Sequence, residues 1–157
     1  MEGKLPDDEK RPVKIGEVLK TLKGREIPVV TEESSVEEAI DAIIRLPHGH
    51  LLYVVDNHRR LMGTISVSNL VRHFFSRSHE PRIHPRHLIS MITTETAKDI
   101  MERHPIFTME DEDVELVLKR MIEKNVEGIA VLDGEKKPAG DITVTDLLGF
   151  LIKTGKK

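Results

Sequence analysis

Two segments of this chain place a hydroxyl three positions before a carboxylate or its amide. One runs from Gly140 to Leu147, and a degraded copy runs from Gly63 to Leu70, 77 residues earlier. Each copy lies where a strand is expected to run into a helix. Such a turn offers free backbone N–H groups and the positive end of the helix dipole, which favour an anionic oxygen such as a phosphate. The repeated pattern therefore predicts a pair of ligand sites.

In the later copy the polar residues are Thr143 and Asp146. Threonine both donates and accepts hydrogen bonds, whereas an ionised aspartate only accepts, and its two oxygens could chelate the two hydroxyls of a ribose. Gly140 would let another backbone or a ligand come close. The alternative is a threonine N-cap with an acidic residue in the first turn, which needs no ligand. The residues alone leave both interpretations open.

The earlier copy carries Ser66 and Asn69 in the same places. An asparagine offers one amide oxygen and one NH₂ group, so it would hold a ribose less firmly and without charge. It could also simply cap the helix or face solvent. We therefore expect this site to be weak, altered in specificity or empty.

The elements that must position these residues follow the same order twice. Aliphatic and β-branched runs predict strands, and apolar residues at helical spacing predict helices. In the first half we expect helices at 13–22, 36–46 and 67–75, and strands at 27–30, 51–55 and 61–66. In the second half we expect helices at 97–101, 111–125 and 144–152, and strands at 106–109, 126–132 and 139–143. The sequence thus predicts an α/β fold made of two βαββα units.

Composition excludes several classes of protein. The 157 residues are 38% hydrophobic but only 3% aromatic, so the core must be aliphatic and no aromatic platform exists for stacking single-stranded nucleic acid. The net charge of −3 argues against a duplex-DNA footprint. Cysteine is absent, which excludes disulfides and cysteine-ligated zinc. No apolar run is long enough to span a bilayer and the start is no signal peptide, so we expect a cytoplasmic protein.

Two segments lie outside the repeated units. Residues 1–12 are polar and charged, and we expect a disordered arm there. Residues 76–96 form a His-rich linker in which His79, His84 and His87 invite a metal interpretation. Pro85 lies between two of these histidines and no acidic ligand adjoins them, so we predict no metal site. The apolar run 88–92 indicates that the linker packs somewhere.

The doubled motif, in this order of elements, resembles tandem cystathionine-β-synthase (CBS) domains, which together form a Bateman module. The short helix at Ala97–Met101 before the second copy is also typical of that family. The resemblance covers about residues 13–152 and implies one repeat at 13–75, another at 97–153, and a pseudo-twofold axis between them. It also implies a non-catalytic regulatory module that binds an adenosine-containing ligand: AMP, ADP, ATP or S-adenosylmethionine.

The resemblance implies that each pocket is completed by the other repeat. At the main site, Gly140, Ile142, Thr143 and Asp146 would be joined by four residues of the first half: Val30, Thr31, Gly49 and His50. At the weaker site, Ser66 and Asn69 would be joined by residues of the second half: Thr108, Met109 and Val126. Glu127 beside the weaker site would repel phosphates.

The chain departs from the family pattern at two pairs of positions. Tyr53 and Ala130 stand where proline often precedes the aliphatic pair, and Ser68 and Thr145 stand where a phosphate-binding arginine often occurs. The number of phosphates on the ligand therefore stays open. We expect no enzyme, because the chain has no nucleophile motif, Walker loop or cysteine. No required cofactor is expected, and an adenine nucleotide would act as an effector ligand.

Partners are expected from the apolar surface and from the family. Leftover apolar residues on the last helix suggest a homodimer: Leu147, Leu148, Phe150 and Leu151. The regulated partner protein is not identified by the sequence. Two alternatives stay open, a ligand-free interaction scaffold and a divalent-cation sensor acting on a separate transporter.

Overall fold

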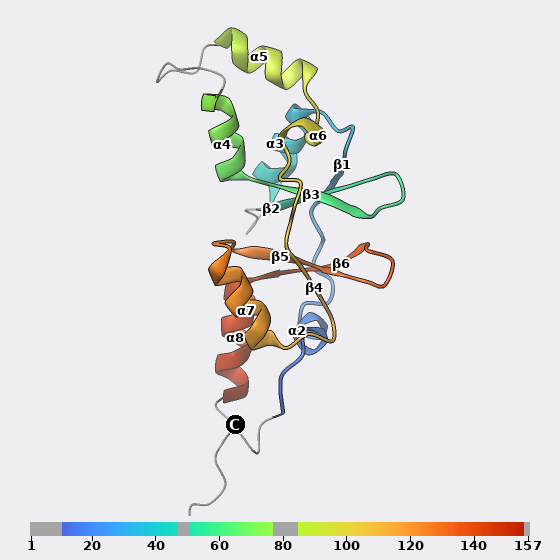
Figure 1. Cartoon of the computed structure of the whole chain (residues 1–157), viewed down its shortest axis with the longest axis vertical. Coiled ribbons are helices and arrows are strands. Elements are labelled where there is room, and N and C mark those ends of the chain that lie inside the picture. Colours follow the sequence, from blue (N-terminus) through green and yellow to red (C-terminus); the bar gives the residue numbers. More distant parts are fainter. Residues whose placement is uncertain (1–10, 47–50, 77–84, 156–157) are drawn as a thin grey trace, which may run out of the picture.

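Two three-stranded sheets face each other at the centre of the molecule (Figure 1). The computed structural model describes residues 11–46, 51–76 and 85–155. The first sheet has the order β1-β2-β3, with strands Val29–Thr31, Leu51–Val55 and Leu61–Ser66. The second has the order β4-β5-β6, with strands Phe107–Met109, Gly128–Leu132 and Pro138–Thr143. In each sheet the middle strand pairs parallel with the first strand and antiparallel with the last.

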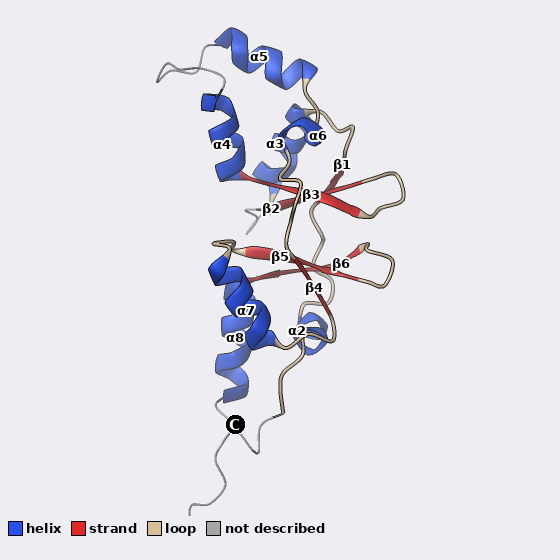
Figure 2. Ribbon diagram, viewed as in Figure 1, coloured by secondary structure: helices blue, strands red, loops and turns tan. Residues whose placement is uncertain are grey.

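The helices lie on the outer sides of the two sheets (Figure 2). Those near the first sheet are α3 (Val36–Arg45), α4 (Val67–Ser76), α5 (Pro85–Thr94) and α6 (Ala97–Ile100). Those near the second sheet are α2 (Ile15–Thr21), α7 (Val114–Glu123) and α8 (Val144–Gly155). The predicted α/β fold with two facing βαββα repeats is confirmed.

The repeat extends to the detail of strand pairing. Tyr53 lies opposite Val29 in the first sheet, and Ala130 lies opposite Phe107 in the second, at equivalent places. Both sheets also carry an irregularity at the same point of the middle strand, between residues 54 and 55 and between 131 and 132. The two halves therefore have the same backbone design.

Local sequence explains why α3 begins where it does. The Ser35 hydroxyl accepts the Glu38 N–H at 3.0 Å, and the Glu38 carboxylate accepts the Ser35 N–H at 3.0 Å. This reciprocal pair satisfies two N–H groups that the first helical turn leaves without partners. The buried face of the helix follows the predicted spacing of apolar residues: Val36, Ala39 and Ile43.

The helix that precedes each repeat packs on the other repeat. Ile15 and Val18 of α2 are fully buried in the core of the second half, whereas Ala97 and Ile100 of α6 are buried in the core of the first half. Backbone hydrogen bonds fix both helices in place. The Ile15 N–H donates to the Glu112 carbonyl at 2.9 Å, and the Ala97 N–H donates to the Ser34 carbonyl at 2.7 Å. Neither half therefore completes its core without a segment from outside its own βαββα run.

We call α2 and α6 the exchanged helices, because each packs on the half that it does not precede. The glycines of the two motifs, Gly140 and Gly63, lie where the segments that carry these helices cross the sheets. A Cβ at Gly63 would stand 2.6 Å from the Glu102 carbonyl oxygen and 2.6 Å from the Met101 sulfur. A Cβ at Gly140 would collide with the Leu19 side chain. The close approach expected at these glycines is thus made by the chain itself.

Two features of the helices differ from the sequence expectations. Helix α5 occupies ten of the 21 residues at 76–96 that we expected to be a linker, and no helix was predicted there. Leu147 was wrongly assigned to a leftover apolar face, because it is fully buried in the second core, where Phe150 and Leu151 also pack. Of the four residues proposed for that face, Leu148 is the large hydrophobic that is well exposed, at 47%. In the described part of the chain, no helix is long and apolar enough to cross a bilayer.

Replacing Gly63 with alanine should destabilise the fold. The new methyl group has backbone on one side, which cannot move as a flexible side chain can, so we expect the free energy of unfolding to fall by about 1–3 kcal/mol. Denaturant unfolding measures the change. Gly134→Ala is the matched control, because a Cβ there meets nothing within 4 Å. Equal stability of the two variants would contradict the crossing contact.

Candidate functional site

The inner faces of the two sheets pack directly on each other. Tyr53, Ala130 and Leu132 form the buried centre of this contact. Partly buried residues from both halves surround them: Ile27, Val29, Leu51, Leu61 and Met109.

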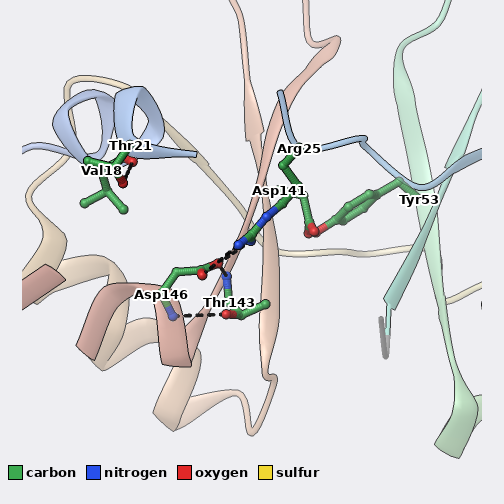
Figure 3. A network of polar contacts seen from close by, with 7 residues as sticks. All are labelled: Val18, Thr21, Arg25, Tyr53, Asp141, Thr143 and Asp146. Carbon is green, nitrogen blue, oxygen red and sulfur yellow. Dashed lines mark hydrogen bonds and ion pairs between the residues drawn. The ribbon is translucent and has the colours of Figure 1, made fainter. Parts of the chain in front are cut away.

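A hydrogen bond between two side chains crosses the interface between the sheets. The hydroxyl of Tyr53 in β2 donates a hydrogen bond to the carboxylate of Asp141 in β6 (Figure 3). Burial raises the pKa of Tyr53 well above its ordinary value, and the nearby Asp141 charge adds to this. Burial also raises the pKa of Asp141, although the Tyr53 hydroxyl and the Arg25 charge oppose the shift. The pair thus ties the halves together at one edge of the contact.

Thr143 caps the N-terminus of α8, and the carboxylate of Asp146 at the same turn also binds an arginine. The Asp146 N–H donates to the Thr143 hydroxyl at 3.1 Å, and the Thr143 N–H donates to Asp146 Oδ2 at 2.9 Å. Arg25 forms two further bonds, with Nη1 2.5 Å from Asp146 Oδ2 and Nη2 3.0 Å from Oδ1 (Figure 3). The capping geometry of the ligand-independent interpretation is therefore present, and both carboxylate oxygens accept hydrogen bonds.

Electrostatics at this turn favour the ionised carboxylate. Burial opposes the charge of Asp146, but the hydrogen bonds from Arg25 and Thr143 outweigh burial and hold the pKa of this carboxyl below its ordinary value. The hydrogen bond to Asp146 likewise raises the pKa of Arg25. At neutral pH the pair is an ion pair with bidentate geometry.

The other residues predicted for this site lie in several places. Gly140 faces Leu19 of α2, and Ile142 is fully buried in the second core. Val30 packs against the first core, and the Thr31 hydroxyl pairs with that of Ser34 at 3.1 Å. The remaining two predicted residues, Gly49 and His50, lie outside the described residues.

The turn at Ser66 repeats the cap with one chemical difference. The Asn69 N–H donates to the Ser66 hydroxyl at 3.0 Å, and that hydroxyl donates to Asn69 Oδ1 at 2.5 Å. The amide oxygen of Asn69 is thus already used, which leaves its NH₂ group to meet a ligand. This turn offers donors where the Asp146 turn offers acceptors.

A cavity of about 580 Å³ opens beside the Ser66 turn and reaches the other half. It brings together Ser66 and Asn69 with Val126 and Glu127, as the resemblance implied. Two other predicted residues of this site do not line it. Thr108 is fully buried and donates its hydroxyl to Glu112, and Met109 packs in the inter-sheet contact. The volume suits a small organic ligand.

Charges of both signs line this cavity. Arg72 and Lys124 supply two cations, Glu102 and Glu127 supply two carboxylates, and His104 stands on the same wall. Arg72 lies one helical turn after Asn69 on α4, so the guanidinium and the amide share a face of the helix. The cations of the cavity therefore offset the repulsion that Glu127 alone would exert on a phosphate.

A second, smaller cavity of about 210 Å³ lies beside Arg25. It is bounded by the connection from α2 to β1, including Lys23 and Ile27, and by Gly140 and Asp141 of β6. It occupies the place in the second motif that corresponds to part of the larger cavity in the first. Among the described residues, no group of three or more histidine and acidic side chains is arranged to hold a metal ion.

Sequence reasoning did not find Arg25, nor the contact between Tyr53 and Asp141. The position of Tyr53 was noted as unusual for the family, but nothing local shows that its hydroxyl crosses to the other sheet. A signal for Arg25 exists in a comparison of the two halves. Arg25 stands four residues before β1, and Arg103 stands four residues before β4, so the sequence places an arginine at the same point of both connections.

Comparison with known families decides the classification. A family model described as the CBS domain matches residues 15–76 and 97–153, which together make up more than half of the chain. The chain belongs to the CBS-domain family. It is a CBS pair, with one family match in each structural half. No curated protein sequence matches it significantly.

Solved CBS structures share the fold. A CBS domain-containing protein from Thermotoga maritima is 28% identical, with a TM-score of 0.72 over 92% of this chain and 97% of that one. CBSX2 from Arabidopsis thaliana, solved in complex with AMP, is 18% identical, with a TM-score of 0.69 over 90% and 98%. The CBS pair of protein MJ0100, solved with 5′-methylthioadenosine and S-adenosylmethionine, is 24% identical, with a TM-score of 0.64 over 88% and 98%. These likenesses confirm the architecture.

The raised pKa of Asp141 predicts that the Asp141→Asn variant gains stability over the parent in a pH-dependent way. A carboxyl whose folded-state pKa is raised stabilises the fold fully at low pH, and this contribution is lost as pH rises through the folded-state pKa. The melting temperature of the variant minus that of the parent should therefore be higher at pH 7 than near pH ~4. Thermal unfolding at both pH values measures this, with the exposed Asp111→Asn as control. A gain independent of pH would contradict the assignment.

Proposed function

We propose that this CBS pair is a regulatory module that binds an adenosine-containing ligand between its repeats and passes the occupancy on to a partner protein. The ligand class is AMP, ADP, ATP or S-adenosylmethionine. The observation that carries the proposal is the 580 Å³ cavity shared by the Ser66 turn and by residues 124–128 of the other repeat. A ligand that contacts both repeats would favour one relative arrangement of them, which is what a regulatory signal requires.

The chemistry of the cavity supports this ligand class. The N-terminus of α4 and the Asn69 NH₂ group offer donors, and Arg72 and Lys124 offer positive charge, all of which suit a phosphate or carboxylate oxygen. The two carboxylates that line the cavity, those of Glu102 and Glu127, suit hydroxyl and amino groups. AMP in CBSX2 and S-adenosylmethionine in the MJ0100 pair are ligands of relatives with this fold.

The two motifs are proposed to have unequal roles. The residue types alone rank Thr143 and Asp146 first, because a carboxylate chelates a ribose better than an amide does. The space and the uncommitted amide donor favour the Ser66 and Asn69 side for the first ligand bound. We retain Thr143 and Asp146, with Gly140, Ile142, Val30, Thr31, Gly49 and His50, as the second site.

Exposed apolar residues support the proposal of a homodimer. They lie on the neighbouring helices α7 and α8: Leu116, Ile122, Leu148 and Ile152. A twofold axis would bury the same surface from two copies. Sedimentation of the full chain would show twice the monomer mass, and a monomer at high concentration would reject this part of the proposal.

Isothermal titration of the full chain with AMP tests the binding function. We expect saturable binding, and we expect Asn69→Ala to weaken the tighter binding event about tenfold, because a hydrogen bond to a charged group contributes about 1.5–3 kcal/mol. Asn57→Ala, in an exposed turn of the same repeat, is the matched control. The absence of binding by AMP, ADP, ATP and S-adenosylmethionine would reject the proposed function.

A further inference from the structure

The two halves differ in the segment that runs from the glycine contact of each exchanged helix to the next strand. Leu19 and Met101 occupy equivalent positions, since each packs on the motif glycine of the opposite half. Leu19 stands ten residues before Val29, whereas Met101 stands six residues before the equivalent Phe107. The first segment therefore has four additional residues: three of them lengthen the helix, which has seven residues in α2 and four in α6, and one lengthens the connection, which runs over 22–28 against 101–106.

A guanidinium from the first connection reaches the second motif, whereas Arg103, four residues before β4, bonds the Lys98 carbonyl at 3.4 Å. Helix α2 continues to Thr21, whose hydroxyl bonds the Val18 carbonyl at 2.7 Å, and Gly24 then turns the chain with φ at +88°. Arg25 follows directly and reaches Asp146, with 33% of its side chain exposed against 14% for the carboxylate. The shorter connection of the other half presents Glu102 and His104 to the equivalent turn. Only the Thr143 turn, among the two described turns, is bonded to an arginine.

Arg25 occupies the atoms that a ribose would use. Its two nitrogens and the Thr143 N–H already bond Oδ1 and Oδ2 of Asp146. A ribose chelated by both oxygens must therefore displace the guanidinium. Neutral hydroxyl donors are weaker partners for a carboxylate than a charged fork, so the exchange disfavours an uncharged nucleoside.

We propose that Arg25 determines the specificity of the Thr143 and Asp146 site, which accepts an adenosine ligand only if that ligand brings an anionic group to receive the displaced guanidinium. This inference rests on the proposed function. The flexible arginine side chain can turn from Asp146 to a phosphate on the same ligand without moving the connection. The other nearby carboxylate, that of Asp141, already accepts the Tyr53 hydroxyl.

The test compares adenosine with AMP on the full chain by isothermal titration. In Arg25→Gln, adenosine affinity should rise about fivefold, the equivalent of about 1 kcal/mol for a partly exposed ion pair, while AMP affinity should not rise. The gain should vanish when Asp146→Ala is added. Arg25→Lys, which keeps the charge without the fork, should fall between the parent and Arg25→Gln. Lys20→Gln removes an exposed charge from α2 as the matched control.

Two results would overturn the inference alone. One is unchanged adenosine affinity in Arg25→Gln, and the other is an equal loss of adenosine and AMP binding, which would make Arg25 a simple ligand contact. Thermal unfolding of each variant separates these results from a loss of folding. Failure of every variant and of the parent to bind either compound would instead reject the proposed function together with the inference.

Discussion

The exchange of short helices between the repeats is the constraint on which this structure depends. The helix that precedes each repeat, α2 or α6, packs in the core of the other repeat. Where each of these segments crosses a sheet, it passes a glycine that has no room for a Cβ. A half that lacked its exchanged helix would leave aliphatic core residues in water, at about 25 cal/mol per Å² of exposed apolar surface. The halves must therefore fold together and face each other.

This arrangement also determines where the two cavities lie. The inner faces of the sheets pack on each other through Tyr53, Ala130 and Leu132. The two cavities therefore lie at the edges of this contact, one beside the Ser66 turn and the other beside Arg25. Residues from both halves line the larger cavity as a direct consequence. A regulatory function needs such a shared site, because a ligand confined to one half would have no preference among arrangements of the two.

Much of the fold could be predicted because local sequence patterns determine it. The strands Leu51–Val55 and Leu61–Ser66 have the predicted bounds, and the Ser35 cap and the apolar face of α3 follow the spacing of their residues. Helix exchange could not be predicted in this way, since α2 and α6 carry no local mark of the half they will cover. Leu147 was assigned to the surface because an apolar helix face is the same in sequence whether it meets a core or a partner.

In the candidate site, too, some features could be predicted from local sequence and others could not. The capping turns and the cavity wall at Val126 and Glu127 follow from the repeat and from the family resemblance. The bonds of Arg25 to Asp146 and of Tyr53 to Asp141 join residues 121 and 88 positions apart. Such contacts depend on the length of a connection and on how two sheets meet, neither of which a periodic pattern encodes.

The central claim is that one ligand contacts both repeats at the larger cavity. Titration of the ¹⁵N-labelled full chain with AMP, followed by amide chemical shifts, tests it most directly. The account predicts that amides at 66–69 and at 124–128 shift together and saturate at the same AMP concentration. Shifts confined to one repeat, or saturation of the two groups at different concentrations, would contradict it.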